Sequence, residues 1–349
     1  MEYYLTSIGT PTKPFRNAEL NTTDEQKQLG LSRAYTLTLS PQIIYTKSKI
    51  VEQLVSSNVY RQLEFQAVGN WWIYSADSRA LKRLPNGRED IFQDNTIDNR
   101  AKRSLMKFLK FVVDYQNQRE IWESHASTSL HAFLSSQFGL PLHLQTVISA
   151  LTLSLDSPEG TLVEFALPRI ARHLTSIGVF GPGFGAVIPK WGGAAEIAQV
   201  ACRAGAVGGG VYILGTGVKS SRPVPEGDLS LEQVELSNGE TVKTKFMAQD
   251  ISRDDVVESK LVSKVIAVVS SPLACLFISS VEGSPVTAVS VVVFPANSLP
   301  NQTHPVYLMV HSSEAGECPP GQCKLHTFLL YYHLMHYDDQ IIPILIYIV

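Results

Sequence analysis

The spacing of apolar residues changes twice along this chain, and this change most limits the folds it can adopt. Residues 63–68 alternate between apolar and polar side chains, which is the period of a half-buried strand. Between about residues 94 and 178 the apolar residues recur every three or four positions, as in helices. Blocks rich in Val and Ile follow residue 178. We therefore expect a sheet-containing domain interrupted by a helical insertion.

Each part contains several expected elements. Before the insertion we predict a helix over 48–63, strands over 63–68, 71–74 and 81–84, and turns at Gly69-Asn70 and Pro85-Asn86-Gly87. The insertion has four apolar helical segments, at 105–112, 130–138, 142–155 and 162–174. Strand-like blocks follow at 211–214, 261–270, 286–294 and 306–310. Pro168 should kink the last helical segment or mark its start.

These elements divide the chain into four expected parts. Residues 1–91 form the first part of a sheet domain, with an irregular segment over 1–30. Residues 92–177 form an all-helical domain, 178–323 continue the sheet domain, and 324–349 are an atypical apolar tail. The predicted fold class is α/β (α+β). A length of 349 residues agrees with two domains, at roughly 150 residues each.

Composition excludes several broad classes. The apolar content of 44% excludes a wholly disordered chain, and a net charge of −3 provides no general basic field for nucleic acid. Four cysteines indicate a reducing compartment. Residues 1–13 lack the basic-then-apolar pattern of a signal peptide. We therefore expect a cytoplasmic protein without a nucleic-acid partner.

Two short motifs suggest chemistry, but each has a simpler interpretation. Residues 181–186 match G-x-G-x-x-A, yet a helix end precedes them and Pro182 removes a backbone donor. A flexible loop is therefore favoured over a dinucleotide site. Cys318 and Cys323 form a C-x4-C pair with His311 and His326 nearby, but zinc needs four ligands and no second pair exists. We favour a turn there, and expect no metal, cofactor or catalytic residue.

A polar strip is the most promising candidate site. Glu196, Gln199 and Arg203 stand at i, i+3 and i+7, which places them on one face of a helix. Four apolar residues can form its buried side: Ile197, Val200, Ala201 and Ala204. Glycines then lead into an expected strand over 211–214. The strip is either an ordinary solvated helix face or a recognition surface for a protein partner.

Residues 196–214 resemble the most characteristic block of the Rab GDI and Rab escort protein superfamily, G-E-x-P-Q-x-x-x-R followed by G-G-x-Y-x-L. Residues 32–74, with Leu-Ser-Pro-Gln-Ile-Ile-Tyr and Tyr-Arg-Gln-Leu-Glu-Phe, are similar to a second block. Residues 103–114 are similar to a lysine-rich helix of the family, and 306–314 resemble escort proteins rather than GDIs. The resemblance covers roughly residues 30–323.

The resemblance implies both a fold and a role. The sheet domain would have the architecture of flavoprotein monooxygenases without bound flavin, and the helices would form the inserted domain II. An escort protein binds GDP-bound Rab GTPases, presents them to the catalytic dimer of Rab geranylgeranyl transferase and carries the product to membranes. The geranylgeranyl lipid would lie within domain II, and the escort itself would not be catalytic. There are two alternatives. One is a GDI that recycles prenylated Rabs, and the other is a flavin- or NAD-dependent oxidoreductase.

The resemblance also implies roles for residues of this chain. The Rab-binding platform would comprise Glu196, Gln199, Arg203, Val211 and Ile213. Val211 stands where GDIs have Thr and Ile213 where they have Met, so a hydroxyl contact is lost. A mobile loop would run from Phe180 and Gly181 to Trp191, and Phe133 would insert into the transferase.

The chain departs from the family pattern near both ends. The family opens with a strand, a glycine-rich turn and a helix that are absent from this sequence. Family-like sequence stops near residue 323, and the last apolar run, 341–349, contains Pro343 and is too short to span a bilayer. We therefore expect residues 324–349 to be an artefact of the gene model.

Overall fold

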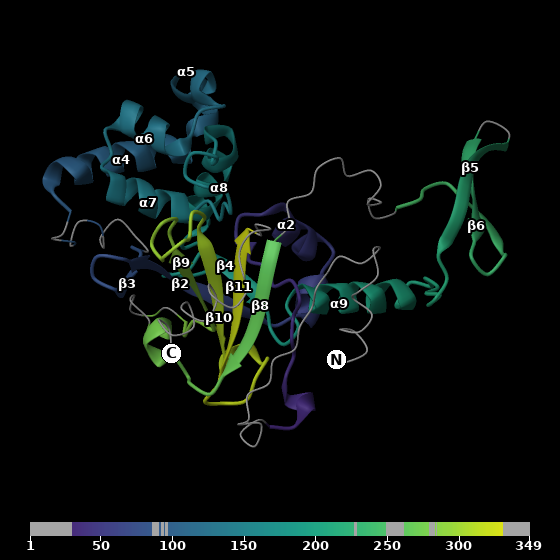
Figure 1. Ribbon diagram of the computed structural model, residues 1–349. Helices are drawn as coiled ribbons and strands as arrows, with labels where there is room; N and C mark the ends of the chain where they lie inside the picture. The colour runs from purple at the N-terminus through teal and green to yellow at the C-terminus, as the bar shows by residue number, and fades with distance from the viewer. Residues whose placement is uncertain are drawn as a thin grey trace. The chain divides into compact units, whose positions relative to one another are not determined.

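The structure is a computed structural model that describes residues 30–85, 91, 94, 97–226, 229–248, 262–278, 283 and 285–330. The chain divides into two compact units (Figure 1). The larger comprises Gln28–Ala201 and Lys260–Val349, and the smaller Met1–Lys27 and Cys202–Ser259.

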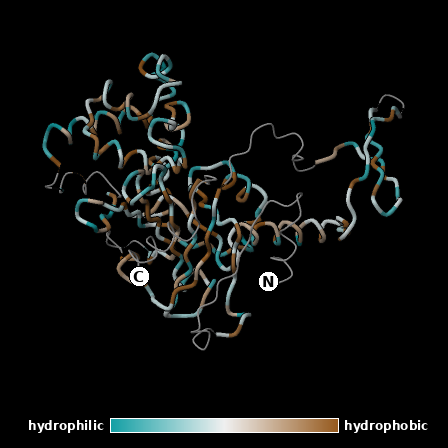
Figure 2. Tube along the Cα trace, viewed as in Figure 1, coloured by the Kyte–Doolittle hydropathy of each residue, from teal (hydrophilic) through white to brown (hydrophobic). Residues whose placement is uncertain are grey.

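An eight-stranded mixed sheet organises the larger unit, in the order β1-β4-β2-β9-β10-β11-β8 with β3 paired to β2. Its strands are β1 (Ile44–Tyr45), β2 (Phe65–Ser75), β3 (Ala80–Arg83), β4 (Ala186–Pro189), β8 (Val262–Val269), β9 (Val289–Phe294), β10 (Val306–Ser312) and β11 (Cys323–Leu330). The β2–β9 pair is parallel and the other pairs are antiparallel. Every residue of β9 is buried, because apolar side chains cover both of its faces. Figure 2 shows hydrophobic positions along these central strands.

A cluster of helices lies on one side of this sheet (Figure 1). The helices are α4 (Asn99–Val113), α5 (Arg119–Trp122), α6 (Leu130–Phe138), α7 (Leu142–Ala150) and α8 (Val163–Ser176). Asp98 begins α4 by accepting hydrogen bonds from the backbone N–H groups of Arg100 and Ala101 at 2.8 and 2.9 Å. Gly139, at φ 61°, ends α6. Helix α8 continues through Pro168, so this proline does not mark its start.

Shorter helices connect these elements. They are α2 (Lys49–Ser56) and the 3-10 helices η3 (Ser32–Ala34), η4 (Val59–Gln62), η5 (Tyr115–Asn117), η6 (Glu123–His125), η8 (Ala274–Phe277) and η9 (Ser313–Ala315). The helix expected over 48–63 is therefore divided. Asn58 interrupts it with a left-handed backbone at φ 58°.

The expected turn at Gly69-Asn70 is wrong, because β2 continues through both residues, with a register shift against β9 between Val68 and Asn70. A Cβ at position 69 would lie 2.0 Å from the Thr287 side chain, so glycine serves a close approach. The buried Asn70 amide donates to the carbonyl oxygens of Leu276 and Ile278 at 3.0 and 3.2 Å. These contacts satisfy the buried amide N–H groups of Asn70 inside a central strand.

The structure corrects two other predictions. Residues 211–214 are not a strand, and the smaller unit instead contains the sheet β5 (Val218–Glu226), β6 (Leu229–Leu236) and β7 (Thr241–Thr244). Strand β11 begins at Cys323 and pairs with β10 and β8, so the expected apolar tail does not start at residue 324. Residues 331–349 lie outside the described residues, as do Asn86 and Gly87 of an expected turn. Strands β3, β8, β9 and β10 match expected blocks closely.

Candidate interaction site on helix α9

Helix α9 (Ala194–Val207) carries the predicted polar strip, and its start depends on two glycines. Gly193 adopts a left-handed φ of 61°. A Cβ on Gly192 would lie 2.5 Å from Oε1 of Glu196, so the half-buried Glu196 carboxylate lies over this glycine. A negative charge is favourable at a helix N-terminus. Glu196, which was predicted to contact a protein partner, therefore stabilises the start of its own helix.

Gln199 and Arg203 are exposed, whereas Ile197 packs against the buried cluster that contains Ile44 and Phe184. The expected buried side is only partly formed. Ile197 and Val200 are half-buried, but Ala201 and Ala204 are exposed. No residue of α9 is fully buried, because its apolar side chains after Ile197 are small or unpacked. This leaves most of the α9 surface exposed.

Large apolar side chains remain exposed just after α9. Val207, Val211 and Leu214 are 85%, 83% and 94% exposed. Ile213, the other predicted apolar platform residue, is 53% exposed. A consecutive exposed apolar run is typical of an interaction surface rather than of scattered surface residues.

Tyr212 lies within this run and returns over the end of α9. Its phenol hydroxyl would lie 2.2 Å from a Cβ on Gly205, so glycine permits this packing. Tyr212 also forms a side-chain hydrogen bond with Cys202. Tyr212 was not among the predicted site residues, although a tyrosine beside glycines and exposed aliphatic residues is a common interface component.

The segment predicted to be a mobile loop contains a buried strand. Residues 178–185 are irregular, with Phe180 53% exposed and Gly181 at φ 153°. Residues 186–189 form β4, which is buried and pairs with β1 and β2. Because α8 precedes this loop and a strand follows it, the segment lacks the strand–loop–helix order of a dinucleotide site.

Trp191 is held at the surface in a strained conformation. It has φ 69° and is 46% exposed, and its backbone N–H donates to the carbonyl oxygen of Ala315 at 2.8 Å. The Lys190 ammonium lies 5.0 Å from its ring centroid and pairs with Glu64 at 2.7 Å. Such a fixed, exposed aromatic residue is a candidate contact for a partner.

Phe133 does not have the position expected of a transferase-docking residue. It is 1% exposed and packs against Phe111, Phe138 and His125 inside the helical cluster. Its apolar stripe on α6 faces the other helices, so the ring fills their core. The insertion of Phe133 into the transferase therefore stays a prediction, and it would require the ring to leave this core.

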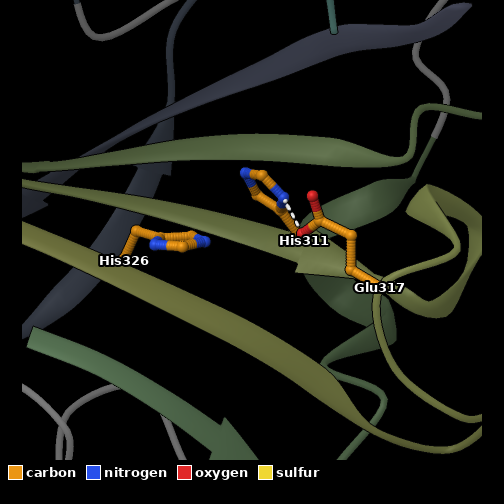
Figure 3. A group of neighbouring side chains, drawn as sticks. All are labelled: His311, Glu317 and His326. Carbon is orange, nitrogen blue, oxygen red and sulfur yellow. Dashed lines mark hydrogen bonds and ion pairs between the residues drawn. The ribbon is translucent and has the colours of Figure 1, made fainter. Parts of the chain in front are cut away.

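A buried polar cluster lies at the β10–β11 hairpin (Figure 3). His311, Glu317 and His326 are each 1% exposed, and the Glu317 carboxylate accepts from Nδ1 of His311 at 2.8 Å. Burial lowers the pKa of both histidines, so their imidazoles are neutral. Burial alone would raise the pKa of Glu317, but His311 and Lys324 lower it.

Lys324 makes this cluster an ion-pair network. Its ammonium pairs with Glu317 and donates to the carbonyl oxygen of Thr36 at 2.9 Å. Thr36 in turn donates from its backbone N–H to the Glu317 carbonyl oxygen at 3.0 Å. The three potential metal ligands are His311, Glu317 and His326. Because Lys324 already balances the charge of Glu317, a divalent cation would add buried charge, and we assign the network a structural role.

The predicted cysteine pair does not take part in these contacts. Cys318 and Cys323 are free and buried, and Cys318 Sγ lies 3.4 Å from the Gln322 carbonyl oxygen across the turn. Gly321, at φ 82°, permits the predicted turn at residues 319–321. The cluster was missed because Glu317 and Lys324 are ordinary charged residues in sequence, and only strand pairing brings them together.

The chain belongs to the GDP dissociation inhibitor family, whose model matches residues 9–323. This confirms the family that the sequence motifs indicated. Two curated relatives are named Rab proteins geranylgeranyltransferase component A. The Saccharomyces cerevisiae relative is 38% identical over 194 residues, 55% of this chain and 31% of that protein. The Candida albicans relative is 31% identical over 310 residues, which are 85% of this chain and 47% of that protein. The chain spans less than half the length of either relative.

Solved structures confirm the expected α/β (α+β), GDI-like fold. Rab GDI from Plasmodium falciparum aligns with a TM-score of 0.64 at 18% identity, over 97% of this chain and 76% of that chain. A triple mutant of putrescine oxidase aligns with a TM-score of 0.52 at 14% identity, over 88% of this chain and 68% of that chain. The second likeness agrees with the expected flavoprotein-like architecture and concerns the fold alone. No helix among the described residues is long and apolar enough to cross a bilayer.

Proposed function

We propose that this chain is part of a Rab escort protein, which binds GDP-bound Rab GTPases and presents them to the Rab geranylgeranyl transferase catalytic dimer. The proposal assigns the chain no catalytic step and places it in the cytoplasm with transient membrane contact. The observation that carries it is the exposed run from Val207 to Leu214 beside a polar helix face, in a chain of the GDI family.

The platform has two chemically different parts. Gln199 and Arg203 offer hydrogen bonds and a positive charge from α9, while Val211 and Ile213 offer apolar area. Protein interfaces typically combine an apolar centre with Arg and aromatic residues, and charge at the edge contributes mainly to association rate. Glu196 acts in this proposal by fixing the first turn of α9. Phe180 and Trp191, which are exposed on the larger unit, are proposed as separate aromatic contacts for the partner.

The geranylgeranyl chain is proposed to lie among α4–α8. Their core is apolar, with Leu130, Leu167 and Ile170 each 0% exposed. Burying a lipid chain stabilises it by about 0.8 kcal/mol per methylene. Because these side chains already pack together, lipid binding would require the helices to separate.

The escort role is favoured over a GDI role because the curated relatives carry the transferase component name. An oxidoreductase is not favoured, because the likeness to putrescine oxidase is one of fold at 14% identity.

A reconstituted prenylation reaction tests the proposal. Unprenylated Rab loaded with GDP or with a GTP analogue is mixed with this chain, the catalytic dimer and geranylgeranyl pyrophosphate. We expect lipid transfer to depend on the chain and to be faster for the GDP form. Binding only to prenylated Rab, without support of transfer, would identify a GDI. Failure to bind either form of Rab would contradict the proposal.

A further inference from the structure

Helix α4 presents a continuous positively charged face. Arg100, Arg103, Lys107 and Lys110 are all exposed and stand at i, i+3, i+7 and i+10, which places them within one stripe. The buried side of the helix faces the helical core through residues such as Leu105 and Phe108. The stripe extends about 15 Å along the helix, at 1.5 Å per residue. We call these four residues the α4 basic stripe.

The stripe does not stabilise its own helix. Each successive pair of its cations is three or four residues apart, and like charges at that spacing repel. Arg100 lies in the first turn, where the helix dipole disfavours a positive charge, and that turn holds no acidic residue. The charges therefore need another explanation.

Neighbouring groups leave these charges largely unneutralised. Within the part of the chain that the structure describes, no ion pair joins a stripe residue to a carboxylate. Asp98, whose charge interacts with Arg100, is already bonded to two backbone N–H groups. Lys107 lies 5.6 Å from the ring centroid of Phe138, which is a weak contact at an exposed site. Four cations are thus available in a chain whose net charge is −3.

We propose that the α4 basic stripe binds the surface of a membrane that contains anionic phospholipids. Clusters of four or more Lys and Arg on an amphipathic helix attract such headgroups. A protein partner fits less well, because the stripe contains no aromatic residue and half of it is lysine, which is depleted from protein interfaces. Since the apolar side of α4 is buried, contact is electrostatic and without insertion. This inference deepens the membrane contact of the proposed function by naming its surface.

Vesicle sedimentation of the full chain tests the inference. Vesicles of phosphatidylcholine alone are compared with vesicles that include about 30% phosphatidylserine. We expect binding only to the anionic vesicles, with binding lost as salt rises to about 300 mM, where charges are screened. Replacing the four stripe residues by Gln should lower the partition coefficient about tenfold or more, because each cation adds to attraction at the surface.

A matched variant removes the same charge elsewhere. Its four residues, also exposed but on the smaller unit, are Lys219, Arg222, Lys243 and Lys245, each replaced by Gln. It should bind anionic vesicles within about twofold of the unmodified chain, since it keeps the α4 basic stripe. Equal loss in both variants, an unaffected stripe variant, or equal binding to neutral vesicles would overturn the inference. The stripe variant should keep its circular dichroism and its Rab binding, so failure of the Rab proposal would be distinguishable.

Discussion

At the residue scale, the Glu317–Lys324 pair shows how a buried charge depends on its partner. Both side chains are 0% exposed, so removing either charge leaves the other uncompensated. We predict that Lys324→Met lowers the free energy of unfolding by about 3–5 kcal/mol. The double variant Glu317→Leu with Lys324→Met should recover most of this loss. Urea unfolding of the unmodified chain, the single variants Glu317→Leu and Lys324→Met, and the double variant measures it, and additive losses would contradict an ion-pair network.

His173 is predicted to make stability depend on pH. It packs against the edge of Trp71 and lies 3.4 Å from the Tyr45 hydroxyl, and burial lowers its pKa to about 4 from 6.5. Its neutral form is therefore the stable one in the folded protein. Its contribution is complete above pH 6.5 and is lost as the pH falls towards 4, by about 3 kcal/mol in total.

The comparison for His173 is the variant His173→Gln, which cannot titrate. We expect unfolding free energy measured between pH 7 and about 4 to fall less steeply in the variant than in the unmodified chain. Parallel curves would show that His173 does not titrate as its burial requires.

Phe133 is predicted to act through stability. Because its ring is 1% exposed among Phe111 and Phe138, Phe133→Ala should create a cavity and cost about 3–5 kcal/mol. Thermal unfolding measures this, with Phe180→Ala as a control at an exposed ring. A loss of transferase binding in Phe133→Ala with unchanged stability would instead support direct docking.

At the element scale, strand β2 depends on glycine at position 69. Gly69→Ala would bring a methyl group against Thr287, and overpacking of this kind costs about 1–3 kcal/mol. Thr287→Ala removes the nearest atom, so the double variant should recover part of the loss. Chemical unfolding checks this coupling, and a stable Gly69→Ala protein would contradict the close approach.

Elements with strong periodicity were predictable, whereas those decided by tertiary contacts were not. Residues 130–138 match α6 because Leu130, Phe133, Leu134 and Phe138 recur at helical spacing, which is a local property. Gly69-Asn70 was misassigned as a turn, since only the distant Thr287 and Leu276 explain these residues inside a strand. Strand β4 was missed because four consecutive buried residues after Gly185 carry no period.

At the scale of the whole molecule, alternating strand and helix periods were sufficient to predict a sheet interrupted by helices. The polar strip on α9 was also predictable, because i, i+3 and i+7 spacing is a local property. The burial of Phe133 and the role of Glu196 over Gly192 were not, since both depend on packing that spacing does not encode. The family resemblance placed Phe133 and Glu196 in binding sites, whereas in the structure both side chains also stabilise the fold.

The most direct test of the account is the affinity of the chain for GDP-loaded Rab, measured by titration with three variants. Replacing Arg203 by Glu, or Val211 and Ile213 together by Ser, should weaken binding about tenfold or more, as expected for central interface residues. Arg222→Glu, an exposed charge in the same unit and outside the platform, should change affinity less than about twofold. Equal affinities for all four proteins would contradict the assignment of α9 and residues 211–213 as the Rab-binding platform.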